Sequence, residues 1–159
     1  MDKLYFGRVA RCHQYVEEVI SRISGALAEK ASDPLVRNIA KNVELDSRKH
    51  AYMLSDIADI IGVEKFPIQE CSRYSGAAYG FLGYLKEVAD KINNLSSDEE
   101  ILETLENILD MLTSIAMTDR SIVIEGLEGR LKEYFAELLM RTEDEEFGHL
   151  SLIRLLWHR

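Results

Sequence analysis

The sequence has little proline and no long apolar run. Its two prolines, Pro34 and Pro67, leave long stretches without a residue that breaks a helix. No apolar stretch approaches the roughly 18 residues that a membrane-spanning helix needs. The first residues carry charges with no apolar segment behind them, which is unlike a secretion signal. We therefore expect a cytoplasmic helical protein that does not enter a membrane.

Cysteine and basic charge are also scarce. Cys12 and Cys71 lie far apart and form no CxxC pair, which excludes a zinc knuckle or a rubredoxin-type iron site within one chain. We expect both to be reduced thiols. The 28 acidic and 19 basic residues give a formal net charge of −9. An acidic surface repels nucleic acid and anionic membranes, so neither is an expected partner, whereas bound cations are compatible with it.

The composition is that of one globular domain spanning residues 1–159. With 47% hydrophobic and 30% charged residues, the chain has the usual balance of a single packed domain. It has no glycine-rich phosphate loop, no GxSxG motif and no Cys–His nucleophile pair. Functional information must therefore come from polar residues inside the predicted helices.

Apolar residues recur every three or four positions and predict a helix over most of the chain. The first long helix is expected from about Leu4 to Lys30. The second begins at Pro34, with Asp33 as its capping residue. Gly62 is expected to end it, because glycine readily adopts the left-handed conformation that follows many helices.

The second half of the sequence predicts three further helices. A connecting helix over residues 72–94 crosses the bundle, and Ser97 with Glu100 forms a capping box that opens the third long helix. The turn before the fourth long helix is expected at residues 126–129. The inner face of the third long helix is expected to carry Leu105, Ile108, Leu112, Ile115, Asp119 and Ile122.

Polar residues interrupt these apolar faces, and burying a charge without a partner costs roughly several kcal/mol. A metal ion would satisfy several such groups at once, because imidazoles and carboxylates both direct lone pairs at a cation. Glu146 and His149 form an ExxH motif whose side chains lie about 60° apart around one helix. The polar residues on predicted inner faces include His13, Glu17, His50, Glu146 and His149.

The order of these segments resembles the ferritin-like superfamily, especially its rubrerythrin-related branch. Residues 15–54 are similar to a first helix pair of that family, and residues 114–153 to a second. Each family pair supplies a glutamate from its first helix and an ExxH motif from its second. The resemblance implies an all-α, ferritin-like antiparallel four-helix bundle with an additional crossover helix.

The resemblance also implies metal ligands at the positions that match the family's motifs. These positions are Glu17, His50, Asp119, Glu146 and His149. The sequence departs from the family at Ser47, where the first ExxH glutamate is expected. Asp46 could replace it only with a rotated helix or a shifted metal, and His13 could add a ligand or hydrogen-bond to Glu17. This count suits one metal better than a bridged pair, because two close cations need shared anionic ligands.

Two functional hypotheses follow. The family resemblance implies an iron or manganese ion between the four long helices and a homodimer. The implied activity is redox chemistry with oxygen or peroxide, as in a non-haem iron oxidoreductase or peroxidase, or iron handling. The alternative, which Ser47 favours, is a metal-free degenerate bundle that acts as a structural or protein-interaction module. In that case His50 and His149 would be neutral core histidines hydrogen-bonded to a tyrosine or a carboxylate.

Overall fold

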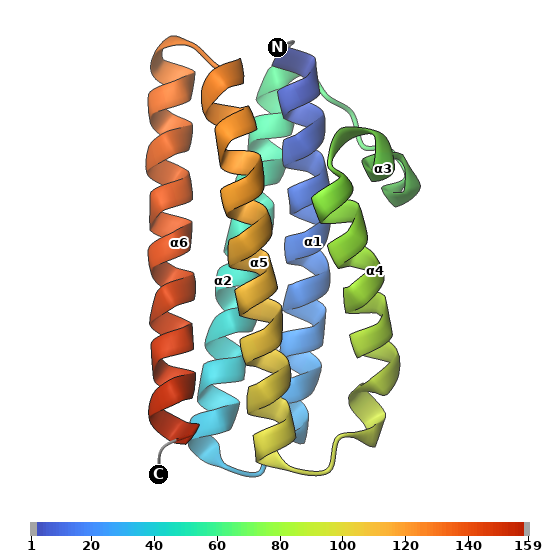
Figure 1. Cartoon of the computed structure of the whole chain (residues 1–159), viewed down its shortest axis with the longest axis vertical. Helices are drawn as coiled ribbons and strands as arrows, with labels where there is room; N and C mark the ends of the chain where they lie inside the picture. The colour runs from blue at the N-terminus through green and yellow to red at the C-terminus, as the bar shows by residue number, and fades with distance from the viewer. Residues whose placement is uncertain (1–2, 158–159) are drawn as a thin grey trace.

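A computed structural model describes residues 3–157, apart from the side chains of residues 120–124 and 126. Within that range it contains six α-helices, two short 3-10 helices and no strand (Figure 1), which confirms the all-α prediction. The helices are α1 (Lys3–Lys30), α2 (Pro34–Ile61), η1 (Ile68–Glu70), α3 (Cys71–Tyr74), α4 (Gly76–Lys91), η2 (Ile92–Asn94), α5 (Asp98–Gly126) and α6 (Gly129–Trp157).

The four long helices α1, α2, α5 and α6 lie along one another, and α4 packs against α1 and α5 (Figure 1). The chain descends in α1, ascends in α2, and descends again in α4 before it ascends in α5 and descends in α6. Because α2 and α5 run in the same direction, the chain must travel the length of the bundle between them. The crossover helix α4 makes that passage.

Local capping sets both ends of α2 and the start of α5 as predicted. Asp33 accepts a hydrogen bond from the Leu35 backbone N–H at the start of α2. Gly62 ends that helix at φ 90°, a left-handed conformation that a side chain would strain. The Ser97–Glu100 capping box opens α5, and the turn before α6 lies within residues 126–129.

The connecting segment differs from the single helix predicted over residues 72–94. It is divided at Ser75, whose backbone is extended at φ −147°. The Ser75 hydroxyl accepts a hydrogen bond from the Ala78 backbone N–H, so this residue caps a new helix instead of continuing the old one. The result is a short α3, a separate α4, and a 3-10 turn at the far end.

Two apolar clusters form the core, and polar positions lie between them. The larger cluster, which includes Leu27, Phe81 and Leu105, joins α1, α2, α4 and α5 with the later part of α6 and the start of α3. The smaller one, which includes Phe6 and Phe135, joins α1, α2 and α6 near the chain's N-terminal end. Five of the predicted inner residues of α5 are buried, from Leu105 to Asp119. The sixth, Ile122, has its side chain outside the described set.

The expectation of two reduced cysteines is wrong. Cys12 of α1 and Cys71 at the start of α3 form a disulfide, and both are fully buried. Their distance in the sequence hid this contact, because only the return of the crossover against α1 brings the two side chains together. No described helix has both the length and the apolar composition needed to cross a bilayer.

Candidate metal centre

Three of the predicted ligands meet between the two apolar clusters. Glu17 comes from α1, His50 from α2 and Glu146 from α6, and all three are buried. One donor atom of each lies within 4.8 Å of a donor atom of the other two. The Nδ1 atom of His50 is 3.5 Å from Oε1 of Glu17. Two carboxylates and one imidazole from three helices therefore face one point.

One oxygen in this group has no partner. The Oε2 atom of Glu17 is buried and accepts no hydrogen bond from any described residue. Leaving a buried acceptor unsatisfied costs about 1–3 kcal/mol, and more when the group is charged. The second carboxylate, Glu146, has a hydroxyl beside it, since Thr113 Oγ1 is 3.3 Å from its Oε2. A cation held by the three side chains would satisfy the Glu17 oxygen.

The metal-free group holds protons. Burial and the nearby charge of Glu17 raise the pKa of Glu146 to about 8, against the lowering effects of His50 and Thr113. Burial by itself would lower the pKa of His50, but hydrogen bonds and charges from Glu17 and Glu145 raise it to about 9. Near neutral pH the group therefore carries protons that a cation would displace on binding.

The two histidines of α2 and α6 are paired reciprocally with acids on the opposite helix. His50 Nε2 is 2.8 Å from Glu145 Oε2, and His149 Nε2 is 2.8 Å from Asp46 Oδ2. On each helix the acid precedes the histidine by one turn. A carboxylate on one ring nitrogen orients the imidazole and leaves its other nitrogen for a metal. For His50 that other nitrogen, Nδ1, is the atom that faces Glu17.

The structure does not bring the other two predicted ligands into the three-residue group. His149 is held by Asp46, and Asp119 lies near His13 Nε2 at 2.5 Å and Ser75 Oγ at 2.8 Å. Burial acts to raise the pKa of Asp119, but the hydrogen bond and charge of His13, with the Ser75 hydrogen bond, lower it overall.

Helix register explains why Asp119 lies apart. On α5 the residue that contacts Glu146 is Thr113, and Asp119 lies almost two turns farther along. His13, which was expected to join the ligands or to hydrogen-bond Glu17, is paired with Asp119 instead. Ser47 is buried in α2, so no carboxylate occupies the position of the first ExxH glutamate.

A cavity of about 60 Å³ adjoins the group. Glu17, His50 and Glu146 line it, and so do His13 and Asp119. A cavity needs only roughly 10–15 Å³ of such space to hold one water molecule, so this one has room for a small ligand. The rest of the wall is mostly apolar and includes Phe6, Val9, Ala10, Leu112, Ala116, Phe135, Leu138 and Leu139.

Sequence reasoning missed Glu145 and Thr113 as neighbours of the group. The spacing of an acid four residues before a histidine occurs on both helices, as Asp46 with His50 and Glu145 with His149. That repeated spacing was the available signal for the reciprocal pairs. Thr113 carries no comparable signal, because threonines on α5 also bond to their own helix backbone.

Comparisons of the chain with protein-family models, curated proteins and solved structures found no match. Any functional assignment therefore depends on the geometry described above.

Proposed function

We propose that this protein is a ferritin-like metal-binding protein that holds one iron or manganese ion on Glu17, His50 and Glu146. The observation that carries the proposal is the convergence of these side chains from three helices around a buried glutamate oxygen that has no partner. The crossover between the parallel helices α2 and α5 supports the ferritin-like arrangement. The proposal includes a homodimer, as the family resemblance implies.

The donor set favours iron or manganese. Carboxylate oxygens with one imidazole suit hard and borderline divalent ions, whereas no thiolate is present to favour zinc in a sulfur site. Three protein donors would leave other coordination positions open, and the same three side chains line the cavity. When bound there, the ion supplies redox chemistry toward a small oxidant such as dioxygen or peroxide.

The protein side chains have separate roles in this proposal. Glu145 fixes the orientation of the His50 ring through Nε2, so that Nδ1 is directed to the ion. Glu17 and Glu146 supply negative charge, and Glu146 and His50 release protons as the ion enters. The apolar wall around Phe6 and Phe135 limits the access of water to the open positions.

A single ion fits better than a pair. Ser47 cannot supply a bridging carboxylate, and Thr113 is the α5 residue that contacts Glu146. His149 is already held by Asp46 outside the three-residue group. Two adjacent cations would therefore repel each other with too few shared anionic ligands between them.

Metal analysis of matched glutamate variants tests the proposal. The untagged protein is stripped of metal, reconstituted with Fe²⁺ or Mn²⁺ without oxygen, and measured by mass spectrometry. We expect about one ion per chain in the unchanged protein and in Glu18→Gln, and less than about a tenth of that in Glu17→Gln. Glu18 is the control because it follows Glu17 directly and pairs with Gln14 instead.

Two results would contradict the proposal: no retained metal in the unchanged protein, or equal metal in Glu17→Gln.

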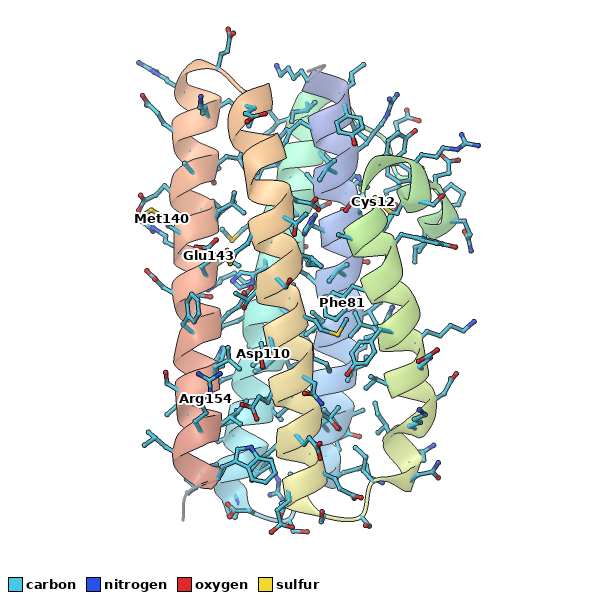
Figure 2. All side chains as sticks on the ribbon, in the orientation of Figure 1. Cys12, Phe81, Asp110, Met140, Glu143 and Arg154 are labelled. Atoms are coloured by element: carbon cyan, nitrogen blue, oxygen red, sulfur yellow. A yellow bond between two sulfur atoms is a disulfide. The ribbon has the colours of Figure 1, made fainter. Side chains whose placement is uncertain are left out.

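Light scattering of the same samples tests the homodimer. The exposed apolar residues Met140, Phe147 and Leu155 on α6 are available for such an interface, and Figure 2 shows Met140 on the outer side of that helix.

The second candidate is a metal-free structural or interaction module. The observation that favours it is that His50 and His149 already have carboxylate partners. In that case added Fe²⁺ or Mn²⁺ leaves the unfolding temperature unchanged. A bound ion at 100 times its Kd would instead stabilise the fold by about 2.7 kcal/mol.

A further inference from the structure

The disulfide and one end of the cavity belong to a closed ring of contacts. Cys12 precedes His13 on α1, and His13 pairs with Asp119 of α5 at 2.5 Å. The Ser75 hydroxyl donates a hydrogen bond of 2.8 Å to the same Asp119 oxygen. The Ser75 backbone N–H donates to the Cys71 carbonyl, and Cys71 is bonded to Cys12. The disulfide thus closes a ring that joins α1, α3 and α5.

The disulfide is the covalent anchor of the segment before Ser75. Among residues 64–74, Cys71 is the one buried residue. Figure 1 shows α3 projecting from the side of the bundle, and Figure 2 shows Cys12 where α1 meets that end of the crossover. The other attachments are non-covalent: the Tyr15 and Tyr5 hydroxyls donate hydrogen bonds to the Phe66 and Tyr74 carbonyls, and the same rings meet edge to face.

The opposite side of the ring faces the candidate metal centre. His13 and Asp119 line the same cavity as Glu17, His50 and Glu146. Ser75 and Asp119 are both buried, so their hydrogen bond holds the end of the crossover against α5 away from water. Without the disulfide, no covalent link keeps the α3 segment beside α1, and the Ser75–Asp119 contact depends on the hydrogen bonds and ring contacts of that segment and on the packing of α4.

We propose that the Cys12–Cys71 disulfide is a redox-controlled latch on this cavity, opened by dithiol reductants. Opening separates Ser75 from Asp119, loosens α5 at the His13 end and speeds the exchange of metal at the centre. The metal part of this inference rests on the proposed function. The coupling between the disulfide and α5 does not.

The reaction is a thiol–disulfide exchange. A thiolate of the dithiol attacks one sulfur of the Cys12–Cys71 bond, which forms a mixed disulfide and releases the other cysteine as a thiolate that takes up a proton. The second thiol of the reductant then breaks the mixed disulfide. The products are two cysteine thiols and a cyclic disulfide, so two electrons pass to the protein. Because both sulfurs are buried, the α3 segment must first open locally.

Hydrogen exchange of the metal-free protein tests the coupling. Oxidised protein is compared with protein reduced by dithiothreitol and desalted without oxygen, and thiol titration confirms the reduction. We expect amide exchange to become about tenfold faster or more over residues 71–78 and also over residues 113–119, with little change over residues 36–43 of α2. Faster exchange confined to residues 71–78 would overturn the proposal.

A serine pair tests the link with the disulfide intact. Ser75→Gly removes the hydroxyl that reaches Asp119, and glycine is tolerated at a capping position. Ser72→Ala is the control, because Ser72 is exposed on α3 and bonds only to the nearby Gln69 carbonyl. We expect oxidised Ser75→Gly to show the fast exchange over residues 113–119, and reduction to add little more. Behaviour of Ser75→Gly like that of Ser72→Ala would contradict the latch.

Release of Mn²⁺ to EDTA tests the functional consequence, since dithiothreitol does not change the charge of that ion. We expect release about tenfold faster after reduction. If both redox forms release Mn²⁺ at the same rate while reduction still speeds amide exchange in α5, the disulfide does not control metal release. The coupling between the disulfide and α5 would then still hold. Protein that binds no Mn²⁺ refutes the proposed function, and the hydrogen-exchange result still decides the latch.

Discussion

His50 and His149, each with its neighbouring side chains, form two halves of a polar layer between the helices. In both halves an acid on the opposite helix pairs with the histidine, but the remaining neighbours differ. On the α2 side, His50 has Glu145 beside one ring nitrogen and Glu17 beside the other. On the α6 side, His149 has Asp46 beside one nitrogen, and the described structure shows no second acidic partner for it. Helix packing of α2 against α6 produces the common pattern.

The difference arises at single positions. Glu17 gives the first half a carboxylate from the neighbouring helix, whereas in the second half α5 offers Thr113 near Glu146. In both halves the acid orients the histidine and leaves its other ring nitrogen, but among the described residues only His50 has two further donors, Glu17 and Glu146, close enough to share an ion with it. The comparison teaches that similar helix packing leaves function to a few side chains.

Exchanging each histidine for glutamine gives the largest contrast. His50→Gln should weaken metal binding by at least about 1,000-fold, or about 4 kcal/mol, because it removes one of three donors. His149→Gln should retain about one ion per chain, because His149 lies outside the group. Calorimetric titration with Mn²⁺ measures both. Equal losses would show that the two halves act as one site.

The pH dependence of the metal-free protein gives the next effect. The pKa of Glu146 is raised from 4.5 to about 8 and that of His50 from 6.5 to about 9, so the fold favours both protonated forms. This stability is complete below the ordinary values and is lost as pH rises through the folded values. The free energy of unfolding should therefore fall by on the order of a few kcal/mol between pH 5 and pH 9.

Denaturant unfolding across that range measures this fall. Glu146→Gln, which stays neutral, should flatten the curve, while Asp46→Asn serves as the control in the other half. A curve for Glu146→Gln as steep as that of the unchanged protein would contradict the assignment of the buried proton to Glu146.

The reciprocal acids should give a smaller contrast. Glu145→Gln removes the carboxylate that orients His50 and should weaken Mn²⁺ binding by about 10- to 100-fold. Asp46→Asn changes the equivalent partner of His149 and should leave the affinity within about threefold, since it orients no proposed ligand. If the two substitutions weaken Mn²⁺ binding equally in the titration, Glu145 has no special role in orienting a ligand.

Lys49 should give the smallest effect. Its Nζ atom lies 2.7 Å from Glu145 and 3.5 Å from Asp46, so it touches both reciprocal acids from a half-exposed position. Surface ion pairs of this kind contribute about 0–1 kcal/mol. Lys49→Met should lower the unfolding free energy by less than about 1 kcal/mol, measured in denaturant at low and high salt. A larger loss would mean that the acids depend on this lysine.

Helix boundaries were the most predictable feature, because they depend on local chemistry. Asp33, Gly62 and the Ser97–Glu100 box act within a few residues of their own positions. The division at Ser75 is also a local cap, which was missed because residues 72–94 look like one helix, and the same hydroxyl bonds to a distant acid, Asp119. That second bond depends on how the crossover meets α5.

The candidate site was predictable in part. Glu17, His50 and Glu146 interrupt apolar faces, and the structure places them together. Asp119 lies on an inner face as expected, yet the register between α5 and α6 puts Thr113 beside Glu146 instead. A pattern on one helix fixes the direction of a side chain around that helix, but not the height at which a neighbouring helix meets it.

The sequence by itself determined the all-helical class, the ends of the long helices and the polar residues that face inward, because periodicity and capping act over a few residues. Only the tertiary structure decided which polar residues share a point, that His50 takes its second partner from α6, and that Cys12 bonds to Cys71. These contacts join residues far apart in the chain, and their geometry depends on the relative placement of whole helices.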